Sequence, residues 1–238
     1  MSARVRASRG RLRTGGAGFS LIELMVVILI VGIVAALAIP ALSVVGFDRH
    51  TYNDAGSIMM LFRSARTRAV ARGGAVLISM TANGTTDRGT FLMYEAVTPN
   101  INGGLARTPV ATCKSPTNWI PLPTTLNPPA NAGVVLLDGV NLNAASASVI
   151  EAQADIETSL WSYPSPGSSA AVAFATGYIC YTPLGHTFID VSASATPVFN
   201  GVLPTTSPIE ARVTRAKGGT TRAVLIPPNG MARLFSHT

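Results

Sequence analysis

The sequence predicts an α+β protein in which one long amino-terminal helix packs against an antiparallel β-sheet or small sandwich. Two observations carry this prediction. A very apolar segment runs into a second stretch with helical periodicity, and no proline interrupts the chain between Pro40 and Pro99. The remainder is a series of short apolar runs separated by glycine-, proline- and asparagine-rich turns, as in antiparallel sheets. We therefore expect three parts: a basic segment over 1–18, a helix over 19–72, and a β-rich domain over 73–238.

The first part, residues 1–18, is strongly basic. It has five arginines and no acidic residue. The whole chain has 18 basic and 11 acidic residues, so 13 basic residues remain without this segment and the net charge falls from +7 to +2. Basic residues ahead of an apolar helix hold that end of the helix in the cytoplasm. The pI of about 10.1 therefore indicates membrane topology rather than nucleic-acid binding.

The second part begins with an apolar segment over 19–39, FSLIELMVVILIVGIVAALAI, which only Ser20 and Glu23 interrupt. At 1.5 Å per residue this segment forms about 31 Å of helix, the thickness of a bilayer core. Three interpretations compete. The segment is the core of an ordinary signal peptide cut after Ala36-Leu37-Ala38, a simple membrane anchor, or an assembly helix that a cut after Gly18 exposes.

Glu23 separates these interpretations. A carboxylate within an apolar helix costs about 2.5–3.5 kcal/mol at mid-bilayer and less near a helix end, and a signal core or an anchor gains nothing from it. After a cut behind Gly18, the new amine of Phe19 can pair with Glu23 of a neighbouring subunit and fix the axial register between them. The alternative is that the carboxylate only complements the dipole at the start of the helix.

The segment GFSLIELMVVILIVGIVAALAIP resembles the class III signal of type IV pilins and type II secretion pseudopilins. In this resemblance Gly18 precedes the prepilin peptidase cut, Phe19 is the exposed and N-methylated residue, and Glu23 is the assembly glutamate. Gly32 and Pro40 fall where these proteins have a helix-softening glycine and proline. Residues 1–18 would then be the prepilin leader, and residues 19–39 the transmembrane and assembly half of the helix.

The resemblance also implies partners and a location. The precursor would cross the bacterial inner membrane once, with its leader in the cytoplasm and its β-rich domain in the periplasm. Prepilin peptidase and an inner-membrane assembly platform would process and extract it from the lipid bilayer. It would then join other pilins or pseudopilins in a helical filament, either a pilus or a pseudopilus.

Beyond Pro40 the helix is expected to continue to Arg72. An apolar stripe recurs at helical spacing in this part, and Gly73-Gly74 is a typical carboxy-terminal stop. The stripe consists of Ile58, Phe62, Ala65 and Ala69. Four arginines over 63–72 are interpreted as a solvated or dipole-complementing helix end.

The β-rich domain contains nine predicted strands, and two hairpin-like turns connect the last three. A cluster of Glu151, Asp155 and Glu157 is interpreted as solvated surface. The order of elements, with ARTRAVARGGAVLISM at the start and AVLIPPNGMARLF at the end, resembles the GspH and FimT branch of minor pilins and pseudopilins. The predicted strands are 75–80, 90–97, 134–138, 171–176, 178–181, 187–191, 209–214, 221–226 and 231–235.

Residues for other chemistry are sparse. Cys113 and Cys180 are far apart and form no CxxC motif, so an exported protein favours a disulfide between them over two buried thiols. The three histidines are isolated, and no phosphate-binding or nucleophile motif occurs. We expect no catalytic residue, no metal and no cofactor.

The sequence thus predicts a minor pilin or pseudopilin that primes or caps a type IV pilus or type II secretion pseudopilus. The alternative is a DNA-binding minor pilin at a filament tip. Some FimT-like pilins bind DNA through a terminal GRxR motif, whereas this chain has Gly230-Met231-Ala232-Arg233. The tail from residue 201 has five basic residues against Glu210, a net charge of +4, which would attract phosphate in a salt-dependent way. These are Arg212, Arg215, Lys217, Arg222 and Arg233.

Overall fold

The structure is a computed structural model, and it describes eleven parts of the chain. They are residues 20–82, 88–98, 108–113, 119, 122–123, 133–143, 156–163, 170–191, 196–199, 207–215 and 220–237, with only the backbone described over 39–47. The chain divides into two compact units, Met1–Ser43 and Val44–Thr238. We call the second one the head unit.

One helix, α1, extends from Leu21 to Arg72 and belongs partly to each unit. It ends where the sequence predicts, because Gly73 adopts φ +67°, a left-handed conformation that glycine enters at little cost. Gly74 follows in a tight place, where a Cβ would lie 2.6 Å from the Cβ of Pro109. The paired glycines therefore stop the helix and turn the chain directly into the first strand.

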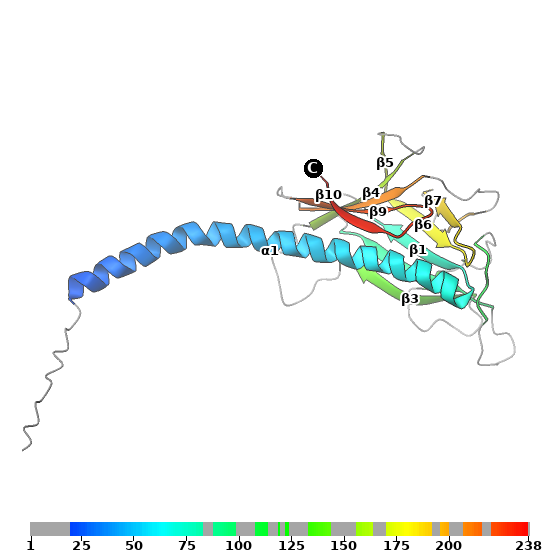
Figure 1. Ribbon diagram of the computed structural model, residues 1–238, viewed down its shortest axis with the longest axis horizontal. Coiled ribbons are helices and arrows are strands. Elements are labelled where there is room, and N and C mark those ends of the chain that lie inside the picture. Colours follow the sequence, from blue (N-terminus) through cyan, green and yellow to red (C-terminus); the bar gives the residue numbers. More distant parts are fainter. Residues whose placement is uncertain are drawn as a thin grey trace, which may run out of the picture. The chain divides into compact units, whose positions relative to one another are not determined.

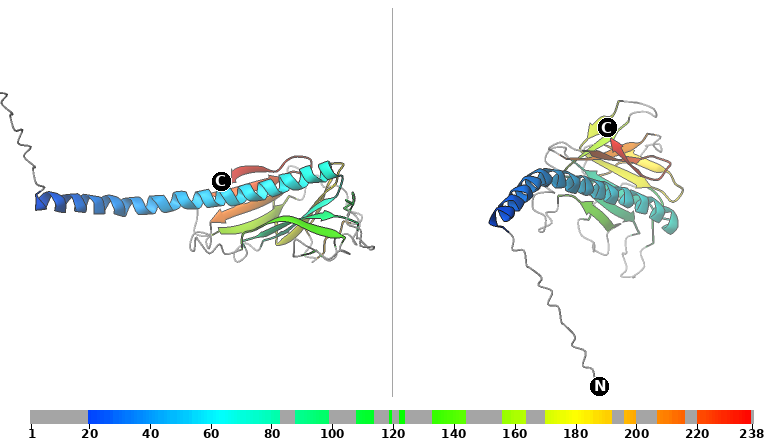
Figure 2. Two further views of the ribbon diagram at one scale, coloured as in Figure 1. Left: turned by 90° about the horizontal axis from the view of Figure 1, so that it is seen from below. Right: turned by 60° about the vertical axis from the view of Figure 1, so that its left-hand side comes forward.

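Within the head unit, α1 (cyan in Figure 1) lies along the strands and packs against both sheets (Figures 1 and 2). The predicted stripe faces inward, with Ile58, Phe62, Ala65 and Ala69 all at most 1% exposed. The ring of Phe62 meets Phe91 edge to face, with the ring centroids 6.4 Å apart. The periodicity read from the sequence is thus the periodicity of burial, and it makes this half of α1 a part of the head core.

The first sheet is antiparallel, with the strand order β3-β2-β1-β6-β7. Alternate residues point to its two faces. One face meets α1 through Val76, Ile78 and Met80, and the other carries Leu77 and Cys180 into a second apolar cluster. Its strands are β1 Val76–Thr81, β2 Thr90–Ala96, β3 Val134–Asn141, β6 Thr176–Tyr181 and β7 Thr187–Asp190.

The second sheet is also antiparallel and has the order β10-β9-β8-β4-β5. Its inner face, with Ile209, Ala211 and Val213 on the central strand, joins the same core as α1. The head is therefore a sandwich of two sheets, one of the arrangements expected from the sequence, and α1 contributes side chains to its core. The strands are β4 Ile156–Ser162, β5 Val172–Phe174, β8 Ile209–Arg215, β9 Thr221–Ile226 and β10 Arg233–His237.

One strand was not predicted. Glu157, a member of the acidic cluster interpreted as surface, is half-buried on β4 between the buried Ile156 and Thr158. The strand was missed because its inward positions include a threonine, so its alternation of burial is not an alternation of hydropathy. Glu151 and Asp155, the other members of the predicted acidic cluster, lie outside the described residues.

Candidate functional site

The first candidate site is the apolar part of α1 over Leu21–Ala38. Its mean hydropathy is 3.0 and none of it is buried, so it is long and apolar enough to cross a membrane. Leucine, isoleucine and valine side chains in it are 50% or more exposed. Covering so much apolar surface requires a lipid bilayer or other apolar helices.

Glu23 lies in the first turn of α1 and is the only charged residue of this apolar part. Its position has a local explanation. Ser20 directly precedes the helix, and its carbonyl accepts the amide of Leu24 at 3.2 Å. Ser20 and Glu23 have the spacing of a capping box, in which a serine and a glutamate three residues later satisfy the first amides of a helix. Within one molecule, this motif and the helix dipole suffice to place a carboxylate here.

The other predicted residues of this segment differ in what the structure says of them. Gly18 and Phe19 lie outside the described residues. At Gly32 an added Cβ would meet nothing within 4 Å, so no contact within the described part of the chain calls for a glycine. Glycine costs a helix about 1 kcal/mol relative to alanine, and it allows two helices to approach closely. Pro40 lies within α1 and removes one backbone hydrogen bond there.

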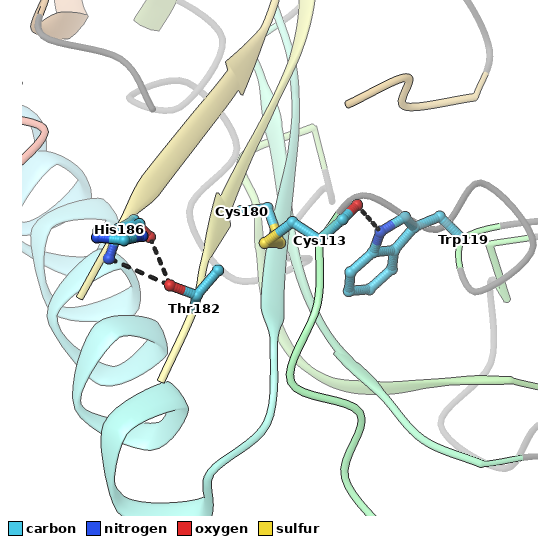
Figure 3. Close-up of a disulfide and its surroundings, with 5 residues drawn as sticks. All are labelled: Cys113, Trp119, Cys180, Thr182 and His186. Carbon is cyan, nitrogen blue, oxygen red and sulfur yellow. Dashed lines mark hydrogen bonds between the residues drawn. A yellow bond between two sulfur atoms is a disulfide. The ribbon is translucent and has the colours of Figure 1, made fainter. Parts of the chain in front are cut away.

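The predicted cysteine pair is a disulfide. Cys113 and Cys180 are joined, with their Cα atoms 6.0 Å apart, and the bond ties the loop after β2 to strand β6 (Figure 3). The indole of Trp119 lies against Cys113 and donates to its carbonyl at 3.1 Å (Figure 3). Trp119 is fully buried. The disulfide thus closes a second small core on the side of the first sheet that faces away from α1.

His186 belongs to a turn that hydrogen bonds close. Its amide donates to Thr182 Oγ1 at 3.1 Å, and that hydroxyl donates to the His186 carbonyl at 3.3 Å (Figure 3). The amide of Thr182 also donates to the His186 carbonyl at 2.9 Å. No group of three potential metal ligands occurs among the residues that the structure describes. The hydrogen bonds are made by the main chain of His186 and close the turn between β6 and β7.

The four arginines at the end of α1 are not a simple solvated helix end. Arg63 Nε donates to the Ala232 carbonyl at 2.8 Å, and Arg66 Nη1 donates to the carbonyls of Pro228 and Gly230 at 3.1 and 3.2 Å. Arg68 and Arg72 each form a 3.0 Å ion pair with Glu95, a carboxylate on β2 whose side chain is only 3% exposed. These arginines hold α1 to the head. Their acceptors are distant in sequence, and no local pattern announces them.

The predicted basic tail does not form one open basic surface. Arg212 pairs with the buried Glu210 at 2.8 Å and stacks on Trp161, with its guanidinium carbon 4.5 Å from the ring centre. Arg222 points to the other face of the sheet and pairs with Asp48 of α1 at 3.0 Å. Two of the predicted cations are thus neutralised by the chain itself.

The remaining members of the tail are less uniform. Arg233 is exposed on β10, Arg215 is half-buried at the end of β8, and Lys217 lies outside the described residues. Hydrogen bonding to Glu210 raises the pKa of Arg212. It also raises the pKa of Tyr163, whose hydroxyl donates to the same carboxylate. Arg212, Glu210, Tyr163 and Trp161 therefore make a closed polar cluster on the outer face of the second sheet.

Comparisons with known proteins find one relationship. Residues 14–39 match the family described as the prokaryotic N-terminal methylation motif. No curated protein and no solved structure matches the chain. The motif indicates a type IV pilin- or pseudopilin-type precursor, and together with the apolar helix it indicates membrane anchoring. It is a motif of structural rather than catalytic proteins.

Proposed function

We propose that the chain is a minor pilin or pseudopilin. Prepilin peptidase cuts it after Gly18 and methylates the new amine of Phe19, and α1 then assembles into a type IV pilus or a type II secretion pseudopilus. The observation that carries this proposal is that the matched methylation motif, 14–39, includes the apolar helix over 21–38, none of which is buried. The proposed cut therefore places a new amine at the start of an apolar helix surface that lipid or other apolar helices must cover.

The charge and redox features support this route. Basic residues 1–18 keep the leader in the cytoplasm, so the helix over 21–38 crosses the inner membrane and the head unit lies in the periplasm. The Cys113–Cys180 disulfide fits such an oxidising compartment. The lipid bilayer covers the apolar helix before assembly. Neighbouring pilin-type helices and the assembly platform are the partners afterwards.

Glu23 has two roles to separate in this proposal. As a cap it acts within its own helix, whereas as an assembly residue it pairs with the Phe19 amine of a neighbouring subunit. A carboxylate in an apolar helix bundle is expensive without such a partner. Pairing between subunits would thus select one register among many apolar ones.

The mature amino terminus tests the processing step. Mass spectrometry of the protein recovered from its native membrane should find a chain that begins with methylated Phe19. A mature chain that begins at Ile39 would instead show an ordinary signal peptide. A chain that keeps its basic segment would show a simple anchor, and either result would overturn the proposal.

Two substitutions at one position test the assembly step. A capping box accepts glutamine in place of glutamate, so Glu23→Gln keeps the cap and removes only the charge, while Glu23→Ala removes both. We expect both variants to be cleaved and both to be lost from purified filaments. If Glu23→Gln assembles as well as the parent and Glu23→Ala does not, the cap is the role of this residue and the proposed pairing is wrong.

A priming or capping position, and a place in the GspH and FimT branch, are the finer parts of the proposal. Their support is the direct passage from α1 into β1 and the closing β9–β10 hairpin, the pattern that resembles this branch. Quantitative mass spectrometry of purified filaments should find far fewer copies of this chain than of the main subunit. Equal numbers would identify a main subunit instead.

DNA binding at a filament tip is the alternative. The exposed Arg233 supports it, whereas the ion pairs of Arg212 and Arg222 count against it. The full-length protein in detergent would have to shift a DNA fragment in a salt-dependent way. That shift would have to be lost in Arg233→Gln and kept in Arg49→Gln, a control at another exposed arginine.

A further inference from the structure

The turn between β9 and β10 borders a shallow depression of about 350 Å³. Its lining is mainly apolar and contains one charged side chain, and no part of the proposed assembly helix contributes to it. The lining residues are Leu225, Pro227, Pro228, Asn229, Gly230 and Arg233. Met231, which adjoins this lining in the sequence, is 45% exposed.

Hydrogen bonds from α1 and β7 hold the β9–β10 turn in place. Arg66 of α1 donates to the carbonyls of Pro228 and Gly230, Arg63 donates to that of Ala232, and the Thr187 hydroxyl donates to that of Pro228. The turn therefore has a fixed shape before any ligand arrives, which lowers the entropic cost of binding. It also has three carbonyls already occupied by donors, so these add little negative potential to the depression.

A second turn lies beside the same arginine. An added Cβ on Gly185 would be 3.9 Å from Arg66 Nη2, so the β6–β7 turn approaches the β9–β10 turn. Leu184 in this second turn is 84% exposed, although the turn itself is closed by hydrogen bonds between Thr182, Gly185 and His186. The β6–β7 turn thus exposes one large apolar side chain, which is not part of the lining of the depression.

The charge of the depression is positive. Arg233 is exposed at its edge, and among the described residues no carboxylate lies within ion-pair distance of it. The nearest acid in the same row of the sheet is Glu210, which is two strands away across Leu225 and is already paired with Arg212. Among the described residues no acid thus competes for Arg233, and its guanidinium can offer two donors to a carboxylate.

We propose that this depression binds a protein segment that places an apolar side chain beside a carboxylate side chain. The apolar side chain would lie on Leu225 and the prolines, and the carboxylate would pair with Arg233. A protein segment fits better than a nucleic acid because the lining is mostly apolar and holds one arginine, while DNA binding needs several phosphate contacts. The inference concerns the head unit alone and does not rest on the proposed assembly function.

The test uses the full-length protein in detergent, labelled with ¹³C at its methionine methyl groups, and follows the signal of Met231. The probe is N-acetyl-leucyl-aspartate amide, and its matched control is N-acetyl-leucyl-asparagine amide, which has no charge. We expect a saturable shift of the Met231 signal with the aspartate probe and a binding constant at least about tenfold weaker with the asparagine probe.

Two variants assign the two halves of the site. Arg233→Gln should weaken the aspartate probe about tenfold or more without changing the asparagine probe, and Leu225→Ala should weaken both. Arg49→Gln, at an exposed arginine of α1, should change neither. Unchanged thermal unfolding of Arg233→Gln would show that its fold is intact, as its exposed position predicts.

Other outcomes would overturn the proposal. Equal binding of the two probes would show that the arginine reads no carboxylate. A shift of Met231 with oligothymidylate of about 12 nucleotides, but with neither peptide probe, would assign the surface to nucleic acid. Failure in this assay would leave the mature amino terminus and the Glu23 variants unaffected, so it is distinguishable from a failure of the proposed function.

Discussion

Glu95 shows how single charged residues anchor α1 to the head. The side chain is 3% exposed and forms 3.0 Å ion pairs with Arg68, 33% exposed, and Arg72, 49% exposed. A buried carboxylate needs such partners, because removing an unpaired charge from water is costly. Glu95 therefore joins the last turns of α1 to the second strand of the first sheet.

Replacing Glu95 by alanine should destabilise the head by about 2 kcal/mol, because the charged hydrogen bonds are lost and the arginines lose their acceptor. Arg72→Ala should cost less than about 1 kcal/mol, because that partner is half-exposed and Arg68 remains. Urea unfolding monitored by tryptophan fluorescence measures both, and both tryptophans, Trp119 and Trp161, lie in the head unit. Equal losses in the two variants would contradict this ranking.

Buried tyrosines make the head sensitive to alkaline pH. Tyr94 is 2% exposed, and burial, followed by the nearby Tyr178, raises its pKa to about 12. Burial also raises the pKa of Tyr181. The unfolded chain loses these protons near pH 10, whereas the folded head keeps them. The stability from this source is thus complete below pH 10 and is lost as the pH rises towards 12.

Tyr94→Phe should reduce this alkaline loss. One tyrosine contributes about 1.4 kcal/mol per pH unit to the slope between pH 10 and its folded pKa. Unfolding free energies measured from pH 9 upward should therefore fall less steeply in the variant, while at pH 7 the two proteins differ only by the lost hydroxyl. Identical slopes would show that Tyr94 ionises in the folded head as readily as in the unfolded chain.

Single residues differ in how far the sequence predicts them. The sequence predicts the cysteine pair and the inward stripe of α1. The disulfide follows from the expected oxidising compartment, and the stripe follows from the 3.6-residue spacing of apolar residues. The partners of Arg63 and Arg66 were not predicted, because main-chain carbonyls far along the chain accept their hydrogen bonds. These arginines are directed to the head by their hydrogen bonds. The exposed residues of this part of α1 therefore include uncharged ones such as Met60, Ser64 and Thr67.

At the scale of elements, prediction succeeded where burial and hydropathy share a period. The strands of the first sheet largely coincide with predicted apolar runs, while the helix stop follows from the left-handed conformation of Gly73. Strand β4 does not coincide with a predicted run, because Thr158 occupies an inward position and its neighbours Glu157 and Ser159 are polar as well. The pairing of β4 with β8 and β5 comes from contacts distant in sequence, and these are what recruit a polar segment into the second sheet.

The loop after β2 is an element that the disulfide organises. The bond closes a 67-residue separation, and it holds Cys113 beside the buried Trp119. Removing a disulfide of this kind typically costs about 2–4 kcal/mol, chiefly because the unfolded chain becomes freer. Trp119 should lose its apolar surroundings when the tether is removed, while the first sheet keeps its strand pairs.

We therefore expect two signals from Cys113→Ala with Cys180→Ala in a Trp161→Phe background. Unfolding should occur at lower urea, and the emission of the remaining tryptophan should move to longer wavelength in native buffer. The parent with Trp161→Phe alone is the matched control, since it keeps the disulfide. Unchanged emission would mean that the second cluster packs without the tether.

At the scale of the whole chain, the boundary between units lies within α1 rather than at its end. Secondary structure suggests a division after Arg72, but the compact unit begins at Val44, because residues from Ala55 onward are buried in the head core. The amino-terminal unit, in contrast, exposes its apolar side chains along Leu21–Ala38. One helix thus belongs to two environments. The chain itself buries the part of the helix in the head core, but it leaves the apolar part over 21–38 exposed.

A chain that begins at Val44 should therefore fold by itself and stay soluble without detergent. It keeps the whole buried core, the disulfide and the Asp48–Arg222 pair. We expect its urea midpoint, followed by tryptophan fluorescence, to equal that of the head in the full-length protein.

A chain that begins at Ser57 is the matched control. It loses Asp48 and the buried Ala55, so Arg222 loses its partner and the head should be about 1–3 kcal/mol less stable. Unfolding of the Val44 chain in buffer would mean that the apolar half of α1 contributes to head stability. Equal stability of the two shortened chains would mean that the contacts near Asp48 are incidental. The expected ranking would instead place the start of the part of α1 that stabilises the head between Val44 and Ser57, where the helix begins to contribute buried residues to the head core.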